Sequence, residues 1–214
     1  GAAHTNTRLA TPNELFDYDP AGNRTFDANI TAYVYNEANQ LTENSKFAYT
    51  YDGNGNQITK KDRTNGRTTT YSYTSENQLK QVSQDGNLVA TYKYDGLGRR
   101  VEKSTGTGLN QGIVRFIYDN EDILAMLDGS NNLIAVFTHG PGIDEPLIMK
   151  TRSGEEFFYH ADALGSIVAL TNVAGEVVER VEYEAYGKPT FIDARGPPVV
   201  SDRSVTPSPY AFAA

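Results

Sequence analysis

The sequence predicts an all-β protein, an array of antiparallel β-hairpins that together form one curled or spiralling sheet. Three observations support this fold class. A short motif, aromatic-x-aromatic-Asp followed by a turn, recurs along most of the 214 residues. A second turn, often Asn-Gly or Asp-Gly, lies between successive copies, and both dipeptides are strong hairpin signals. Between the turns, apolar and polar residues alternate with a period closer to two than to 3.6.

Composition and charge narrow the class of protein. The chain has 14 Tyr and 9 Phe but no Cys, which excludes a disulfide framework, a thiolate nucleophile and a Cys-based zinc site. Its formal net charge of -8 argues against nucleic acid as a partner, because phosphate binding needs clustered Lys and Arg. No run of about 18 apolar residues occurs, so we expect no membrane span.

The clearest copy of the motif covers residues 92–101. Tyr92 and Tyr94 are two apart, so in a strand both rings point to the same face. Asp95 opens the turn, because its short side chain can accept hydrogen bonds from the following backbone. Gly98 supplies the positive φ that closes the turn, and Val101 begins the return strand.

The other copies follow when the chain is aligned on the second aromatic position. Successive anchors are 16 to 24 residues apart, most of them 21 or 22, and a fixed period in this range indicates a repeat architecture. In the second copy Asn36 and Asn39 replace Asp and Gly and keep the turn chemistry. The anchor positions are Tyr18, Tyr35, Tyr51, Tyr73, Tyr94, Tyr118, His139, Ala161 and Tyr183. The turn residues that accompany them are Asp19, Gly22, Asp52, Gly55, Asp95, Gly98, Asp119, Asp162, Gly165 and Gly187.

The second turns complete each repeat. They lie at Asn65-Gly66, Asp85-Gly86, Asp128-Gly129, Ser153-Gly154 and Ala174-Gly175. One segment, residues 121–127, is compatible with a short helix or a strand. We expect a strand, because a turn-rich stretch follows it and an apolar segment returns. Overall we expect at least a dozen short strands, with the aromatic anchors packed in a ladder and more buried than Lys93 or Thr91.

Three regions are expected along the chain. Residues 1–15 read as a lead-in with the remnant of an expression tag, and residues 16–192 as the repeat domain. Residues 193–214 read as a Pro-rich extended tail. We expect the first strand near Phe16–Tyr18 and the last near Val177–Tyr183, with no obvious cap on either. The ends must then meet, pair edge to edge with another copy, or swap strands, and self-association of the isolated chain is favoured.

The repeats resemble the YD or RHS repeats of bacterial Rhs and wall-associated proteins, toxin-complex B and C subunits and teneurins. The resemblance covers residues 16–190 and is most specific in the C-terminal third. Segments 139–147, 159–166 and 183–189 look like successive elements of bacterial Rhs proteins. In that family an Rhs core and a variable toxin domain follow, and residues 208–212 lie near where that core should begin. The resemblance implies a structural, non-catalytic piece of a shell or stalk on a large exported protein, either secreted or at the bacterial surface. Its implied partners are the neighbouring repeats, the Rhs core and a toxin cargo.

Catalytic, cofactor and metal sites are not predicted. The segment starting at Asp52 places oxygens at alternate positions, as a calcium loop does, but Gln57 and Arg63 stand where such a loop needs Gly and Glu. Turn chemistry is the better interpretation. His139 and His160 occupy successive repeats and could approach each other on adjacent strands, but a local hydrogen-bonding role is favoured. We expect no enzyme and no cofactor.

A second function stays open. Aromatic rings on a sheet surface can stack on sugars, so exposed Tyr and Phe could form a module that binds carbohydrate or a cell-surface partner. The same rings in a core simply pack, and the structural role is favoured.

Overall fold

The computed structural model describes residues 14–106, 112–142, 145–197, 199–201 and 203–209. Within these ranges the chain forms 19 strands and no helix. The described residues therefore contain no helix that is long and apolar enough to cross a membrane. The strands are β1 (Phe16–Tyr18), β2 (Arg24–Asp27), β3 (Val34–Tyr35), β4 (Leu41–Glu43), β5 (Phe47–Tyr51), β6 (Gln57–Asp62), β7 (Thr68–Tyr73), β8 (Leu79–Gln84), β9 (Asn87–Tyr94), β10 (Arg100–Thr105), β11 (Gly112–Asp119), β12 (Asp122–Asp128), β13 (Leu133–His139), β14 (Pro146–Thr151), β15 (Glu156–Ala161), β16 (Ile167–Asn172), β17 (Val177–Tyr183), β18 (Pro189–Asp193) and β19 (Val199–Ser201).

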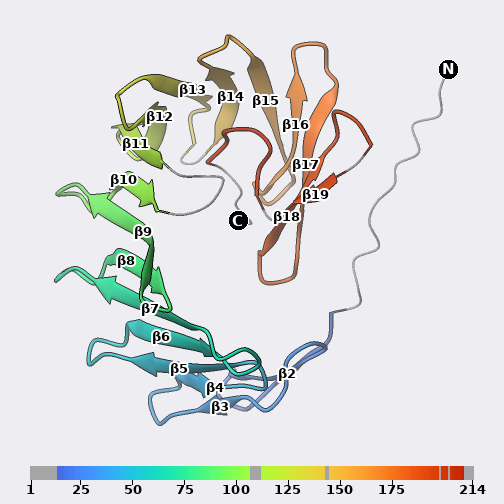
Figure 1. The fold of residues 1–214 in the computed structure, drawn as a ribbon. Coiled ribbons are helices and arrows are strands. Elements are labelled where there is room, and N and C mark those ends of the chain that lie inside the picture. The colour runs from blue at the N-terminus through green and yellow to red at the C-terminus, as the bar shows by residue number, and fades with distance from the viewer. Residues whose placement is uncertain (1–13, 107–111, 143–144, 198, 202, 210–214) are drawn as a thin grey trace.

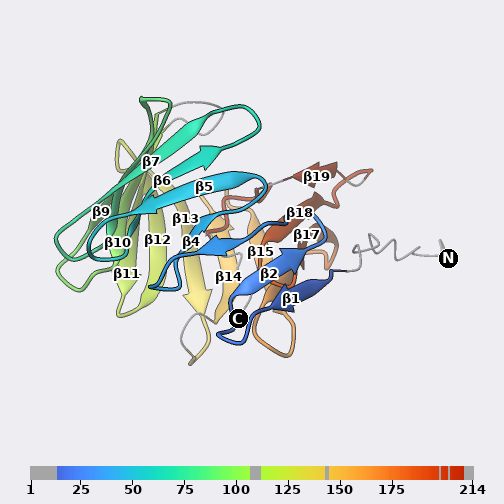
Figure 2. The same cartoon turned by 90° about the horizontal axis from the view of Figure 1, so that it is seen from below.

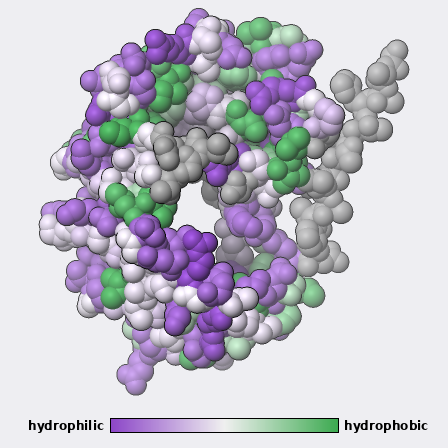
Figure 3. All heavy atoms as spheres, viewed as in Figure 1, coloured by the Kyte–Doolittle hydropathy of each residue, from purple (hydrophilic) through white to green (hydrophobic). Residues whose placement is uncertain are grey.

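The strands follow one another in a single antiparallel series. β1 and β2 form a separate hairpin, and β3 to β19 form one sheet in which each strand pairs with its neighbours in sequence. The sheet is not closed into a barrel, since no register joins β19 to β3 in the described part of the chain. Instead the sheet curls, so that its two halves face each other (Figure 1), and a central hollow lies between them (Figure 3).

The predicted fold class is therefore confirmed. The described strands are all short, and the segment at residues 121–127 is strand β12, as the turn-rich stretch after it indicates. The expected first strand is confirmed as β1. The expected last strand is wrong, because β18 and β19 follow β17.

The C-terminal region departs from the expected extended tail. Residues 199–201 pair with β18, and β18 itself ends at Asp193, one residue inside the expected tail. Pro197 lies between the two strands and not within either, so the missing N–H of proline does not interrupt the pairing. The expected lead-in, residues 1–15, lies outside the described residues except for Glu14 and Leu15.

One face of the sheet lines the hollow, and we call it the inner face. Its position follows from residues 204–208, which lie inside the curve of the sheet (Figure 1) and contact Tyr159 and Glu179. From β11 to β17 the inner face is mainly apolar and holds the core, a cluster of ten buried side chains. They are Phe116, Met126, Ala135, Phe137, Met149, Phe157, Tyr159, Ile167, Leu170 and Val178.

The first half of the inner face is less buried. The cross-strand pairs Tyr71–Val82 and Val82–Ala90 continue the same face through β7, β8 and β9. Tyr92 and Tyr94 are half-buried, as is Thr91, while Lys93 is exposed. The expected difference in burial therefore holds against Lys93 but not against Thr91. In the space-filling view an opening separates the two halves, and hydrophilic residues border its lower side (Figure 3).

Candidate functional site

The anchor tyrosines form a ladder of hydrogen bonds that runs along the sheet. Each of six anchors donates its hydroxyl to the backbone carbonyl of the first residue of the preceding strand. Tyr94 at the end of β9, for example, donates to the carbonyl of Leu79 at the start of β8, with 2.9 Å between the oxygens. The full set is Tyr35 to Arg24, Tyr51 to Leu41, Tyr73 to Gln57, Tyr94 to Leu79, Tyr118 to Arg100 and Tyr183 to Ile167.

This ladder explains why tyrosine recurs at the anchor position of the motif. The ring buries apolar area, and the hydroxyl donates to a strand-end carbonyl. Burial of the ring and of the hydroxyl raises the pKa of Tyr183 to about 12. A carbonyl at a strand end otherwise depends on water for a partner, so the hydroxyl joins one hairpin to the next.

The turn after most anchors is held by one side-chain oxygen. Asp95 Oδ1 accepts hydrogen bonds from the backbone N–H of Leu97 and of Arg99, both at 3.0 Å. Gly98, at the fourth position of the turn, has a φ of 85°. The same pair of bonds, to the second and fourth residues onward, recurs at Asp19, Asn36, Asp52, Asp128, Asp162 and Asn172.

Some turns differ from the sequence prediction. Asp119 does not open such a loop, because it pairs directly with Asp122 across a two-residue turn in which Asn120 has a φ of 52°. Asp128 does open one, although the sequence analysis assigned it to the second kind of turn. There Asn131, with a φ of 63°, takes the place of the glycine. The signal was present in the spacing from Asp128 to Asn131, since Asn also tolerates the left-handed region.

The carboxylates of these turns are acceptors of hydrogen bonds. The side-chain amide of Asn56 and backbone N–H groups lower the pKa of Asp52 below its ordinary value. Asp52 Oδ1 is already used by two amide hydrogens, so turn chemistry accounts for the segment that resembled a calcium loop. In the described part of the chain, no group of three or more His, Asp or Glu side chains has the arrangement of a metal site.

The two histidines do not form a pair. His139 ends β13 and His160 lies in β15, and β14 runs between these strands. His160 Nε2 instead lies 2.9 Å from Thr171 Oγ1 on the neighbouring strand β16. The idea that the histidines meet on adjacent strands is therefore wrong. Each repeat contributes two strands, so equivalent positions of successive repeats lie two strands apart.

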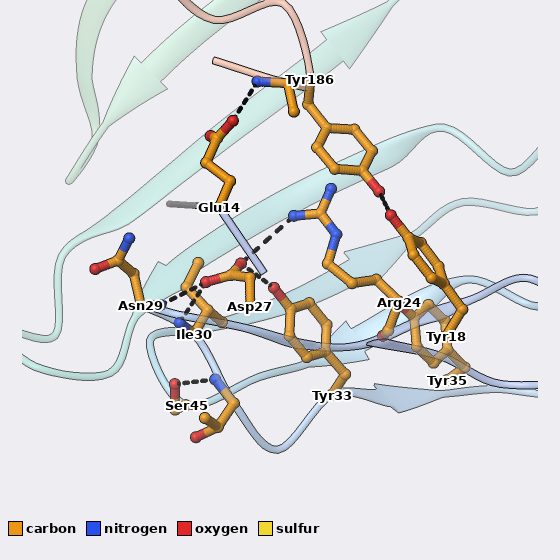
Figure 4. Close-up of polar contacts among 12 residues, drawn as sticks. Glu14, Tyr18, Arg24, Asp27, Asn29, Ile30, Tyr33, Tyr35, Ser45 and Tyr186 are labelled. Atoms are coloured by element: carbon orange, nitrogen blue, oxygen red, sulfur yellow. Dashed lines mark hydrogen bonds and ion pairs between the residues drawn. The ribbon is translucent and has the colours of Figure 1, made fainter. Parts of the chain in front are cut away.

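The two ends of the array meet at a contact that we call the seam. It joins the β1–β2 hairpin to the turn between β17 and β18. Figure 2 shows these elements side by side, and Figure 4 shows the residues that meet there. Arg24 lies over the ring of Tyr186 at 3.6 Å from its centroid, and Phe16 packs edge-on against the same ring at 5.0 Å. The hydroxyls of Tyr18 and Tyr186 are hydrogen-bonded.

Further polar contacts hold the hairpin at the seam. Glu14 accepts a hydrogen bond from the backbone N–H of Ala185 at 2.8 Å. Asp27, which is buried, accepts from the Tyr33 hydroxyl at 2.6 Å and from the backbone N–H of Ile30 at 2.7 Å (Figure 4). Burial and this bond raise the pKa of Tyr33 to about 12. The seam thus closes the curve with side chains and without strand pairing.

A second contact fixes the C-terminal segment, residues 204–208, to the inner face. Glu179 on β17 is 1% exposed and accepts hydrogen bonds from Ser204 Oγ and from the backbone N–H of Val205, the latter at 2.6 Å. The Tyr159 hydroxyl lies 2.8 Å from Ser208 Oγ. Burial raises the pKa of Glu179, and the hydrogen bonds compensate in part for the cost of placing a carboxylate there.

Comparisons with known proteins find a matching family model and several relatives. A family model described as Teneurin YD-shell matches residues 5–193. The tRNA nuclease WapA of Bacillus subtilis (strain 168) is 32% identical over 84% of this chain. The double-stranded DNA deaminase toxin A of Burkholderia cenocepacia (strain H111) is 26% identical over 92% of it.

The chain is short beside these relatives. It spans 8% of the length of the WapA protein and 15% of the deaminase toxin. Among solved structures, the Tc holotoxin pore of Photorhabdus luminescens aligns over 81% of this chain and 13% of its own, with 14% sequence identity and a TM-score of 0.41.

Proposed function

Because the chain belongs to the Teneurin YD-shell family, we propose that it is a section of wall in a β-sheet shell or stalk. This family agrees with the resemblance of the sequence to YD or RHS repeats. The shell would belong to a large exported bacterial protein, either secreted or at the cell surface, and would enclose or present a C-terminal toxin domain. Its direct partners would be the neighbouring repeats, an Rhs core and that cargo.

The observation that carries this proposal is the curved sheet with two different faces. The tyrosine ladder repeats one hydrogen bond at six positions between β3 and β17, and strand pairing continues from β3 to β19. The inner face holds the core in its second half, and the central hollow lies between the two halves (Figure 3). A wall that must hold its shape needs such periodic bonds and no catalytic group, so we assign none.

The nature of the cargo rests on the relatives. One is named a tRNA nuclease and another a double-stranded DNA deaminase toxin, and the present chain corresponds to a small part of each. We therefore propose that the activity of such a protein lies outside these 214 residues. A carbohydrate-binding role has no comparable support, since six anchor tyrosines use their hydroxyls within the ladder.

Cysteine labelling tests the shell, because the chain has no native Cys. Thr69 on β7 lies opposite Lys60 on the inner face and is half-buried, whereas Thr70 is the next residue, on the outer face, and is exposed. Single variants Thr69→Cys and Thr70→Cys are compared in the isolated chain and in the full-length gene product, using a maleimide attached to a bulky polymer.

We expect both cysteines to react in the isolated chain. In the full-length product only Thr70→Cys should react at its former rate, because the inner face is then enclosed. Equal loss of reactivity at both positions would indicate burial between domains. Unchanged reactivity at Thr69→Cys would contradict a closed shell.

A further inference from the structure

The inner face differs in character between its two halves. Over β11 to β17 it is apolar and its aromatic and aliphatic side chains are buried. Over β5 to β10 it carries tyrosines, threonine and lysines that are not covered. The registers place these residues on one face, since Tyr49 is opposite Lys60, Lys60 is opposite Thr69, and Tyr92 is opposite Lys103. We call this half the open inner face.

A surface pocket, which is not the central hollow described above, lies at one end of the open inner face. It has a volume of about 280 Å³ and is bordered by side chains of β5 to β8. Lys60 and Phe47 both line this pocket, and the ammonium of Lys60 lies 4.0 Å from the centroid of the Phe47 ring. The one carboxylate at its border, Asp62, accepts hydrogen bonds from the backbone N–H of Thr64 and Asn65 in its own turn.

A second cationic position lies across the face on β10. Lys103 is opposite Tyr92, and Arg100 lies over the Tyr92 and Phe116 rings at 5.6 and 5.5 Å from their centroids. Partial desolvation and the like charges of Arg100 and Arg203 lower the pKa of Lys103. Arg203 comes from the stretch just before the C-terminal segment, so three cations approach one another at this position.

The outer face of β9 to β11 carries a cluster in which the charges are paired. There Glu102 lies between Lys93 and Arg115 on the adjacent strands and forms ion pairs with both, at 2.7 and 3.0 Å. Lys60 and Lys103 have no ion-pair partner in the described part of the chain. In a molecule with a net charge of -8, the open inner face is therefore a region of unbalanced positive charge facing the hollow.

We propose that the open inner face binds an acidic segment of polypeptide in an extended conformation. The two cationic positions are four strand spacings apart, or about 19 Å. An extended chain crosses this distance with about six residues. The tyrosines between them offer rings and hydroxyls that suit a peptide backbone. Only the identification of this segment with enclosed cargo rests on the proposed function.

Fluorescence anisotropy with the full 214-residue chain tests the proposal. The probe is a fluorescein-labelled, glutamate-rich peptide of about twelve residues, long enough for an extended chain to reach both cationic positions. The test variant is Lys60→Gln/Lys103→Gln. Its matched control is Lys61→Gln/Lys150→Gln, which removes the same charge from the outer face, since Lys61 adjoins Lys60 and Lys150 adjoins the buried Met149.

We expect the inner-face variant to weaken binding by roughly tenfold, as loss of two ion-pair contacts predicts, and the outer-face variant by less than about twofold. Circular dichroism checks that all variants keep the fold. Equal weakening by both variants, or none by the inner-face variant, would overturn the proposal, as would tighter binding of an oligothymidylate probe of equal charge. Peptide binding without protection of Thr69→Cys in the full-length product would reject the shell and leave the binding face standing.

Discussion

Two tyrosines on one strand separate the effect of a ring from that of its hydroxyl. Tyr92 and Tyr94 are both half-buried on the inner face of β9. The Tyr94 hydroxyl bonds to the Leu79 carbonyl, whereas the Tyr92 hydroxyl has no hydrogen bond within the described residues. Because both rings are only partly buried, the cost of about 3 kcal/mol that a fully buried ring predicts for Tyr94→Ala is too high. The hydroxyl can be measured more directly.

Tyr94→Phe should lower the free energy of unfolding by about 1 kcal/mol, because it leaves the Leu79 carbonyl with only water as a partner. Tyr92→Phe is the matched control and should change stability by less than about 0.5 kcal/mol. Urea denaturation followed by circular dichroism measures both. Equal effects would show that the ladder bond does not contribute to stability.

A pH dependence follows from the turn after β18. The Arg195 side chain donates to Asp193 at 3.0 and 2.7 Å and lowers the pKa of Asp193 to about 2. A depressed pKa in the folded state means that the contribution of Asp193 is fully present above the unfolded pKa, near 4. That contribution is lost as the pH falls from about 4 toward 2. Asp193→Asn should therefore flatten the curve of stability against pH between about pH 2 and 4. The slope of the curve near pH 7 should not change. Thermal unfolding at intervals of pH tests this, and an unaltered acid limb would contradict it.

Among the elements, the turns were predictable and the C-terminal strands were not. Asp95 and Gly98 determine their loop through bonds within five residues, so the sequence alone contains the information. The second turn at Asp128 lies where it was predicted, but Asn131 takes the positive φ in place of Gly129. β19 was missed because its neighbouring prolines suggested a tail, although only the residues between prolines pair. The error over His139 and His160 has a different cause. The period of a repeat does not tell which strands are adjacent when each repeat contains two strands.

The C-terminal segment is attached mainly through one buried carboxylate. Ser204→Ala removes both hydrogen bonds from Ser204 Oγ to Glu179 and its contact with Thr206 Oγ1. We expect faster hydrogen exchange of the amides of residues 204–208, by roughly tenfold if about 1.4 kcal/mol of local stability is lost. Exchange in β5 to β8 should stay unchanged and serves as the internal control. If exchange rises everywhere, the substitution acts on global stability and the segment has no separate attachment.

On the scale of the whole molecule, the curvature and the seam lie beyond local sequence reasoning. Tyr18 and Tyr186 are 168 positions apart, and whether they meet depends on twist accumulated over the intervening strands. The sequence indicated that two ends without caps must meet, pair with another copy or swap strands. In the structure the ends meet through side chains, while self-association of the isolated chain stays a prediction. The two outcomes are linked, because breaking the seam would free the β1–β2 hairpin and the β17–β18 turn.

Tyr186→Ala tests this link. The ring contacts Arg24 and Phe16, and its hydroxyl bonds to Tyr18, so its loss removes most of the seam. The matched control is Leu164→Ala, which lies at the same position of the turn between β15 and β16 and is 75% exposed. We expect small-angle scattering at low concentration to show a larger radius of gyration for Tyr186→Ala only. At high concentration the same variant should self-associate more than the parent chain, because the freed ends offer contacts to a second copy. If Tyr186→Ala keeps the dimensions of the parent, then the curvature of the sheet alone brings the ends together and the seam merely occupies the space between them.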